Sequence, residues 1–221
     1  MTTAERRGMD WTLRGLGLAP VTLAALDLAN PDRDWIELMA SYLVNGRAGW
    51  LLTVACLTLA VASLALVDAA RRAGTRGPGL WLLRVWAAGL VIGALVPADP
   101  PGNWDQSSVA DAVHGLAALA AFTALPVAAV TLTHRWRRNP RWVASRRSLT
   151  LAAVAVVSTF LAFVVVFLDV IGGPSLSVGS HESLAGLAER AMIWAYVAWL
   201  AVVAVALRRE RAGAASTAAL P

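Results

Sequence analysis

Six long apolar segments dominate this sequence and leave little choice of fold class. Each is long enough, at about 1.5 Å per residue of α-helix, to cross about 30 Å of hydrocarbon. They occupy residues 11–29, 49–70, 80–96, 109–133, 149–171 and 184–207. Only 15% of the residues are charged, whereas soluble proteins have about 25%. The sequence therefore predicts an all-α polytopic membrane protein, a single six-helix domain over residues 1–211 followed by a disordered tail over 212–221.

The arginines predict how this bundle is oriented. All 19 basic residues are arginine. All but Arg33, Arg47 and Arg190 lie before or near the start of the first segment, in or beside the second and fourth connections, or after the sixth segment. Because basic residues favour cytoplasmic loops, we expect a multi-pass protein of the cell membrane with both termini cytoplasmic. We expect no nucleic acid as a partner, since no basic and aromatic surface remains outside the spans.

Three shorter patterns predict local structure. Gly89 and Gly93 form a GxxxG pair that favours close packing of the third span against a neighbour. Residues 34–44 place apolar side chains at helical spacing, which predicts an amphipathic helix on the outer interface. Tryptophans at the span ends are typical of interface anchors: Trp11, Trp50, Trp81, Trp104, Trp136 and Trp142.

Ionisable side chains gather near the predicted outer face. A charge inside a span is costly unless it is paired or hydrated, so such groups are candidates for a site. By the predicted orientation, the groups at the outer ends of four spans reach one depth and form a polar pocket. They are Asp27, Asp99, Asp111, His114, Asp169, Glu189 and Arg190.

A structural interpretation stays open for these same residues. Arg190 can simply pair with Asp27 or Asp169, and His114 can bond to a neighbouring helix. No metal site is expected, because only two histidines lie on the outer side and no HExxH motif is present. No cofactor is expected either, and the single cysteine, Cys56, lies in an apolar run and supports no disulfide framework.

Several short motifs occur in a fixed order along the chain. They are DLANP from Asp27 to Pro31, Gly49-Trp50, PADP from Pro97 to Pro100, His114-Gly115, and Glu189-Arg190 with Trp194 following. In this order the chain resembles domain-of-unknown-function family 998, bacterial membrane proteins common in actinobacteria. The resemblance covers nearly the whole chain and implies a six-helix membrane domain with no assigned chemistry. A looser similarity of type is to small integral-membrane terpene cyclases, without a match of motif residues.

Three functions are compatible with this pattern. The first is an enzyme acting on a lipid or isoprenoid substrate by acid-initiated chemistry, with Asp99, Asp111 or Glu189 as proton donor and His114 orienting it. Its hydrophobic substrate would meet Asp27, Asp169, Arg190 and Trp194, and Trp86 or Trp199 would help shield a carbocation. The second is a non-enzymatic lipid-binding or accessory membrane protein, and the third is a small transporter. Membrane lipids are expected partners in each case, and a homo-oligomer is left open.

Overall fold

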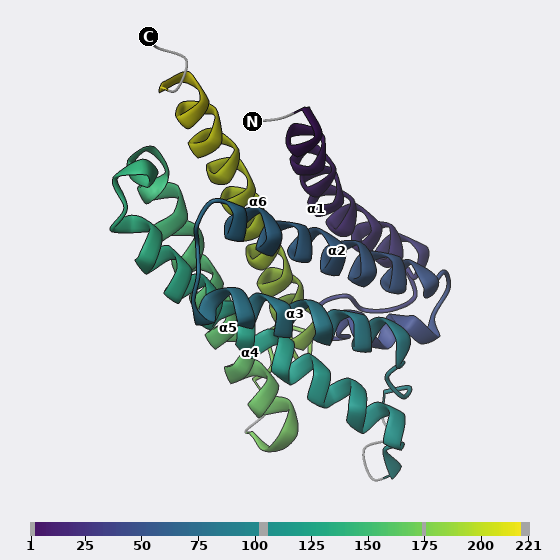
Figure 1. Cartoon of the computed structure of the whole chain (residues 1–221). Helices are drawn as coiled ribbons and strands as arrows, with labels where there is room; N and C mark the ends of the chain where they lie inside the picture. The colour runs from purple at the N-terminus through teal and green to yellow at the C-terminus, as the bar shows by residue number, and fades with distance from the viewer. Residues whose placement is uncertain (1–2, 102–105, 174–175, 218–221) are drawn as a thin grey trace.

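The computed structural model is an all-helical bundle (Figure 1). It describes residues 3–101, 106–173 and 176–217, and side chains between residues 8 and 210 of these. Six helices are long and apolar enough to cross a membrane. They are α1 (Thr3–Ala29), α2 (Trp50–Arg72), α3 (Pro78–Leu95), α4 (Val109–Arg137), α5 (Arg146–Gly172) and α6 (Ala185–Thr217), with the short 3-10 helices η1 (Ala40–Asn45) and η3 (Pro140–Ser145). The predicted class, an all-α protein with six apolar spans, is confirmed, and the described residues form no strand beyond one isolated bridge between Val178 and His181.

The six helices give the bundle two different ends. Both termini lie at one end, here called the terminal end (Figure 1). The opposite or distal end carries the connections at residues 30–49, 96–108 and 173–184. α6 continues to Thr217, past the expected domain boundary at residue 211, and the last four residues lie outside the described part of the chain, so the disordered tail stays a prediction.

The two glycines of the GxxxG pair have different roles. A β-carbon at Gly89 would lie 2.7 Å from the carbonyl oxygen of Ala117 and from the β-carbon of Ala121, so only glycine lets α3 approach α4 this closely. A β-carbon at Gly93 would meet only the ring of His114, at 3.7 Å. Gly89 therefore supports helix packing as expected, whereas Gly93 leaves space beside a histidine.

The interface anchors are only partly as predicted. Trp11, Trp50 and Trp81 are exposed. Trp136 and Trp142 are buried, and their rings stack in parallel with centroids 4.5 Å apart, because η3 folds back beneath the end of α4. The prediction is wrong for these two residues, and Trp104 lies outside the described residues.

The amphipathic helix predicted over residues 34–44 is also wrong. This segment contains turns followed by η1, and only the latter is helical. Its backbone is instead bonded to the start of α6, because the carbonyls of Ile36 and Glu37 accept hydrogen bonds from the N–H groups of Leu187 and Gly186. These carbonyls cap the exposed amides of α6, which a separate helix could not do.

Candidate functional site

A buried ion pair joins α1 to α6 near the distal end. Nε and Nη2 of Arg190 donate to the two carboxylate oxygens of Asp27, at 3.0 and 2.5 Å. Nη1 of the same guanidinium donates to the carbonyls of Leu38 and Gly186, at 2.8 and 3.1 Å. Arg190 therefore pairs with Asp27, one of the two partners left open by the sequence, and also holds the backbone of the α1–α2 connection. We call this arrangement of Asp27, Arg190 and the Leu38 carbonyl the clamp.

The α1–α2 connection is closed at its base by Asn30. The side-chain amide donates to the carbonyls of Leu26 and Arg47 and accepts from the N–H of Arg47, all within 2.8 Å. Asn30 is buried, so loss of these bonds would leave polar groups unsatisfied. The Asn-Pro break in the sequence was the available signal for this role, because such pairs mark turns.

Asp99 and Asp111 form a hydrogen-bonded network at the start of α4. Ser108 is the N-cap, and its hydroxyl accepts from the N–H of Asp111. Asp99 accepts from the N–H and hydroxyl of Ser108, at 2.7 and 2.9 Å. Asp111 accepts from the N–H of Asp99 and the hydroxyl of Ser107, at 2.9 and 2.7 Å. We call these four residues the cap cluster, and its carboxylates fix the α3–α4 connection on the helix end.

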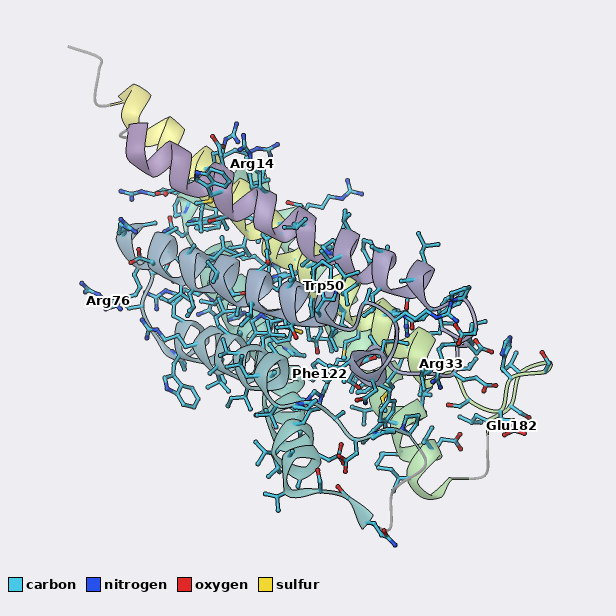
Figure 2. All side chains as sticks on the ribbon, turned by 90° about the vertical axis from the view of Figure 1, so that its right-hand side faces the viewer. Arg14, Arg33, Trp50, Arg76, Phe122 and Glu182 are labelled. Carbon is cyan, nitrogen blue, oxygen red and sulfur yellow. The ribbon has the colours of Figure 1, made fainter. Side chains whose placement is uncertain are left out.

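A partly open cavity with about 80 Å³ of interior space lies in the bundle below these loops. Most of its lining residues are small or apolar, including Trp86, Leu90 and Phe122. Its ionisable side chains are Glu189, His114 and Cys56, from α6, α4 and α2. Phe122, labelled in Figure 2, lies in the middle of the bundle, so the cavity reaches well below the distal surface.

Glu189 is the buried acid of this cavity. Its side chain comes from the second turn of α6, and only 3% of the residue is exposed. One carboxylate oxygen, Oε2, accepts from the N–H of Ala40 at 2.5 Å. The other, Oε1, has no hydrogen bond among the described residues, and the carboxyl group lines the cavity. Glu189 therefore has one anchored oxygen and one that a bound molecule can reach.

His114 lines the same cavity from α4. Its Nδ1 lies 2.7 Å from the carbonyl oxygen of Val96, at the end of α3. This bond fixes the ring toward Gly93, whose missing side chain leaves room for it. Of the four proposed catalytic residues, the structure thus places Glu189 and His114 at one cavity, and Asp99 and Asp111 in the cap cluster.

A second cavity of about 60 Å³ lies beside the clamp. Asp27, Arg190 and Trp194 line it, and it shares Leu23, Ala40 and Ile193 with the first cavity. Trp194 is half exposed on the outside of the bundle. Three of the four expected substrate-binding residues therefore lie together between α1 and α6.

The fourth, Asp169, is positioned elsewhere, where it closes the end of α5. One of its carboxylate oxygens accepts from the N–H of Leu176 at 2.8 Å, and it lines neither cavity. Trp199 is also outside both linings, because its ring is buried and its N–H donates to the hydroxyl of Thr133. Of the tryptophans considered for a carbocation, Trp86 alone lines the first cavity among the described residues.

The distal surface carries one group of side chains with the composition of a metal site. Asp34, Glu37 and His181 bring three ligand atoms within 4.8 Å of one another, and Figure 2 shows the neighbouring Arg33 and Glu182 at this end. Their bonds dock two loops, since Nδ1 of His181 lies 2.8 Å from a carboxylate oxygen of Asp34 and Glu37 accepts from the Glu182 N–H at 2.7 Å. The Ile36 N–H, followed by the His181 charge, lowers the pKa of Asp34. These bonds account for the group without a metal ion.

Tyr42 was not singled out from the sequence but stands between the two acidic groups. Burial, followed by the negative charges of Asp111 and Glu189, raises the pKa of Tyr42 to about 12. Its phenol is therefore neutral at physiological pH. Periodicity places Tyr42 on an apolar stripe, so only the three-dimensional arrangement identifies it.

The comparisons with known proteins are consistent with this architecture. No curated protein and no solved structure matches the chain. The model of one family, described as a protein of unknown function (DUF998), matches residues 14–206. This match begins in α1, ends in α6 and includes every residue of the clamp, the cap cluster and the first cavity. The chain is a member of the DUF998 family of unknown function, and its structure is that of a six-helix membrane protein.

Proposed function

We propose that this protein is a membrane-embedded enzyme that binds a lipid or isoprenoid in the first cavity and protonates it from Glu189. One observation carries the proposal: a buried carboxyl and an imidazole share a cavity whose other walls are nearly all apolar. Apolar walls select an apolar chain, because burying such surface stabilises by about 25 cal/mol per Å². A few polar groups at a largely apolar pocket are typical of small-molecule sites.

The residues suit acid-initiated chemistry of the terpene-cyclase type. In its protonated form, Glu189 is a general acid that can give its proton to an alkene carbon or an epoxide oxygen. Opening an epoxide breaks a C–O bond, its electron pair stays on oxygen, and a carbocation remains. The face of Trp86 lines the cavity and would stabilise that cation. The final proton would leave to the Glu189 carboxylate or to the imidazole of His114, which restores the neutral product.

A second candidate is a non-enzymatic lipid-binding protein. It is favoured by the clamp and the cap cluster, where Asp27, Arg190, Asp99 and Asp111 are all engaged in holding backbone segments together. In that case the first cavity would hold an intact lipid and Glu189 would only orient it. Both candidate functions place the bound molecule in the same cavity. Only the enzyme would convert that molecule, so turnover distinguishes the two.

Turnover in a lipid extract separates the two. Protein in nanodiscs is incubated with the apolar extract of the producing cells, and bound and free species are followed by mass spectrometry. We expect the wild type to convert at least one bound species, Glu189→Gln to retain it unchanged, and the control Asp111→Asn to convert it. Equal conversion by Glu189→Gln would contradict the proposed acid. A wild type that returns the bound lipid unchanged would favour the second candidate.

We further propose that the terminal end faces the cytoplasm of a cell membrane, since most arginines belong to that end. In a Cys56→Ser background, an impermeant maleimide applied to intact cells is expected to label Asp32→Cys and to spare Arg72→Cys. Both positions are exposed, so the reversed result would invert the orientation.

A further inference from the structure

The hydrogen-bonding roles within the first cavity limit what can bind there. Nδ1 of His114 lies 2.7 Å from the Val96 carbonyl oxygen, and a carbonyl oxygen only accepts. Nδ1 therefore carries the hydrogen. In a neutral imidazole Nε2 is then the unprotonated nitrogen and offers a lone pair. His114 presents an acceptor, so its partner must be a donor.

Glu189 adds a group that can either accept or donate a hydrogen bond. Its Oε2 is occupied by the Ala40 N–H, and its Oε1 has no hydrogen bond among the residues that the structure describes. Oε1 accepts when the carboxylate is ionised and can donate when the carboxyl is protonated. A hydroxyl has one hydrogen and two lone pairs, so it satisfies both residues when the acid is protonated, by donating to Nε2 of His114 and accepting from Oε1 of Glu189.

The charges nearby disfavour an anionic ligand. Arg190 follows Glu189 directly in α6, yet its guanidinium is bound to both oxygens of Asp27 and to two backbone carbonyls. It lines the second cavity and is absent from the lining of the first. With Asp27 neutralising Arg190, Glu189 leaves the local charge at zero or minus one. A phosphate or carboxylate buried here would lack a cationic partner, which is costly.

We infer that the first cavity recognises an uncharged amphiphile whose polar end is a hydroxyl group. This inference rests on the proposed function, because it specifies the molecule bound at the same site. The hydroxyl donates to Nε2 of His114, and its oxygen accepts from Oε1 of the protonated Glu189 carboxyl. The chain of the alcohol packs along Trp86, Leu90 and Phe122. A lipid phosphate is excluded as the bound form. Beside the protonated acid an amine is disfavoured too, because an ammonium group only donates and leaves the hydrogen on Oε1 without an acceptor.

Four probes with one carbon skeleton test this choice. Geraniol, geranyl phosphate, geranylamine and the hydrocarbon 2,6-dimethyl-2,6-octadiene are bound to the protein in phosphatidylcholine nanodiscs, and dissociation constants are measured by native mass spectrometry. Geraniol is expected to bind about tenfold more tightly than the other three, as one satisfied buried hydrogen bond predicts. His114→Phe is expected to weaken the affinity for geraniol to that for the hydrocarbon. His134→Phe, an exposed position on the same helix, is the matched control and should change nothing.

A second variant tests the same assignment if His114→Phe does not fold. Glu189→Gln keeps the size of the side chain and is expected to weaken the binding of geraniol more than that of the hydrocarbon. Phosphate or amine binding at least as tight as geraniol, and sensitive to Glu189→Gln, would overturn the hydroxyl assignment and leave the proposed cavity intact. Binding that none of these cavity variants changes, or no binding of any probe, would overturn the assignment and the proposed function together.

Discussion

Two groups of ionisable side chains lie near the distal end and differ in how completely they are bonded. In the cap cluster, both carboxylates of Asp99 and Asp111 accept hydrogen bonds from backbone and hydroxyl donors on every oxygen. In the cavity, Glu189 has one bonded oxygen, and His114 has one nitrogen engaged with Val96. Both groups contain carboxyl side chains near the distal end of the bundle. Only the second has unused hydrogen-bonding capacity facing a cavity.

The number of hydrogen bonds that a carboxyl group already makes distinguishes a structural role from a catalytic one more clearly than its charge does. A saturated carboxylate lowers the free energy of the fold, and a reactant can reach it only by breaking the bonds that hold the loop. A partly bonded carboxyl in an apolar cavity is anchored by one oxygen and can serve a ligand with the other. The clamp resembles the cap cluster in this respect, because Arg190 and Asp27 are bound to each other.

The largest effect is expected from breaking the clamp. Arg190→Met leaves Asp27 unpaired and releases the Leu38 carbonyl. Because the Asp27 side chain is 28% exposed and partly hydrated, we expect a loss somewhat below the roughly 3–5 kcal/mol of a fully buried pair. The free energy of unfolding in detergent is the measurement. The double variant Asp27→Leu/Arg190→Met should cost less than the sum of the singles, since no charge stays unpaired. Arg208→Met, which removes an exposed pair with Asp10, is the control and should cost about 0–1 kcal/mol. A clamp variant no worse than this control would contradict the structural role.

A smaller effect is expected where the loop meets α6. A β-carbon at Gly186 would lie 2.4 Å from the carbonyl oxygen of Leu38 and 2.6 Å from that of Trp35, and both are backbone atoms. Gly186→Ala should therefore destabilise by about 1–3 kcal/mol, as overpacking does. Gly115→Ala is the matched helical control, because nothing lies within 4 Å of its added carbon, and it should be neutral or stabilising. Equal melting temperatures for the two variants would argue against the close docking of the loop.

The cap cluster should matter for stability and not for binding. Asp99→Ala and Asp111→Ala each remove bonds around the Ser108 cap and are expected to cost about 1 kcal/mol in thermal unfolding. Neither should change geraniol binding by more than about twofold, since both residues lie outside the cavity lining. A loss of binding as large as that of Glu189→Gln would erase the distinction between the two groups.

The smallest effect is expected at Asp34, on the exposed surface. Because the Ile36 N–H and the His181 charge lower its pKa below 3.8, Asp34 stabilises the loop above that pH, and the benefit disappears as pH falls through the lowered pKa. Asp34→Asn should therefore have a slightly lower melting temperature than wild type at pH 6. The difference should shrink as the pH is lowered below 3.8, and a difference that widens on acidification would contradict this sign.

The six spans could be predicted because hydrocarbon thickness fixes their length and composition. The bounds of the predicted segments and of the six helices agree within three residues, except that α1 begins eight residues earlier and α4 and α6 continue four and ten residues further. The local structure of residues 34–44 could not be predicted, because its apolar spacing fits a helix while its carbonyls are needed as acceptors for α6. Trp142 was misjudged for a similar reason, since stacking on Trp136 depends on how η3 folds back.

The candidate site was recoverable only in outline. The positions of Glu189 and Arg190 within α6 mark both as charged groups that are costly inside a membrane span. The two side chains do not face the same neighbours, because adjacent positions on a helix point in different directions. The structure directs Glu189 to the first cavity and Arg190 to the second. The sequence could not distinguish Asp111 from Glu189 as an acid, because hydrogen-bond saturation depends on neighbours distant in the chain, such as Ala40.

The central claim, that the first cavity holds an apolar molecule beside Glu189 and His114, is tested most directly by filling the cavity. Gly93→Leu adds a side chain next to His114 without touching backbone, and Gly115→Leu adds the same side chain at an open position on α4. The measurement is mass spectrometry of apolar molecules that co-purify with each variant. The structure predicts that an apolar species bound to the wild type is retained by Gly115→Leu and lost from Gly93→Leu. Equal retention by both variants would contradict the claim.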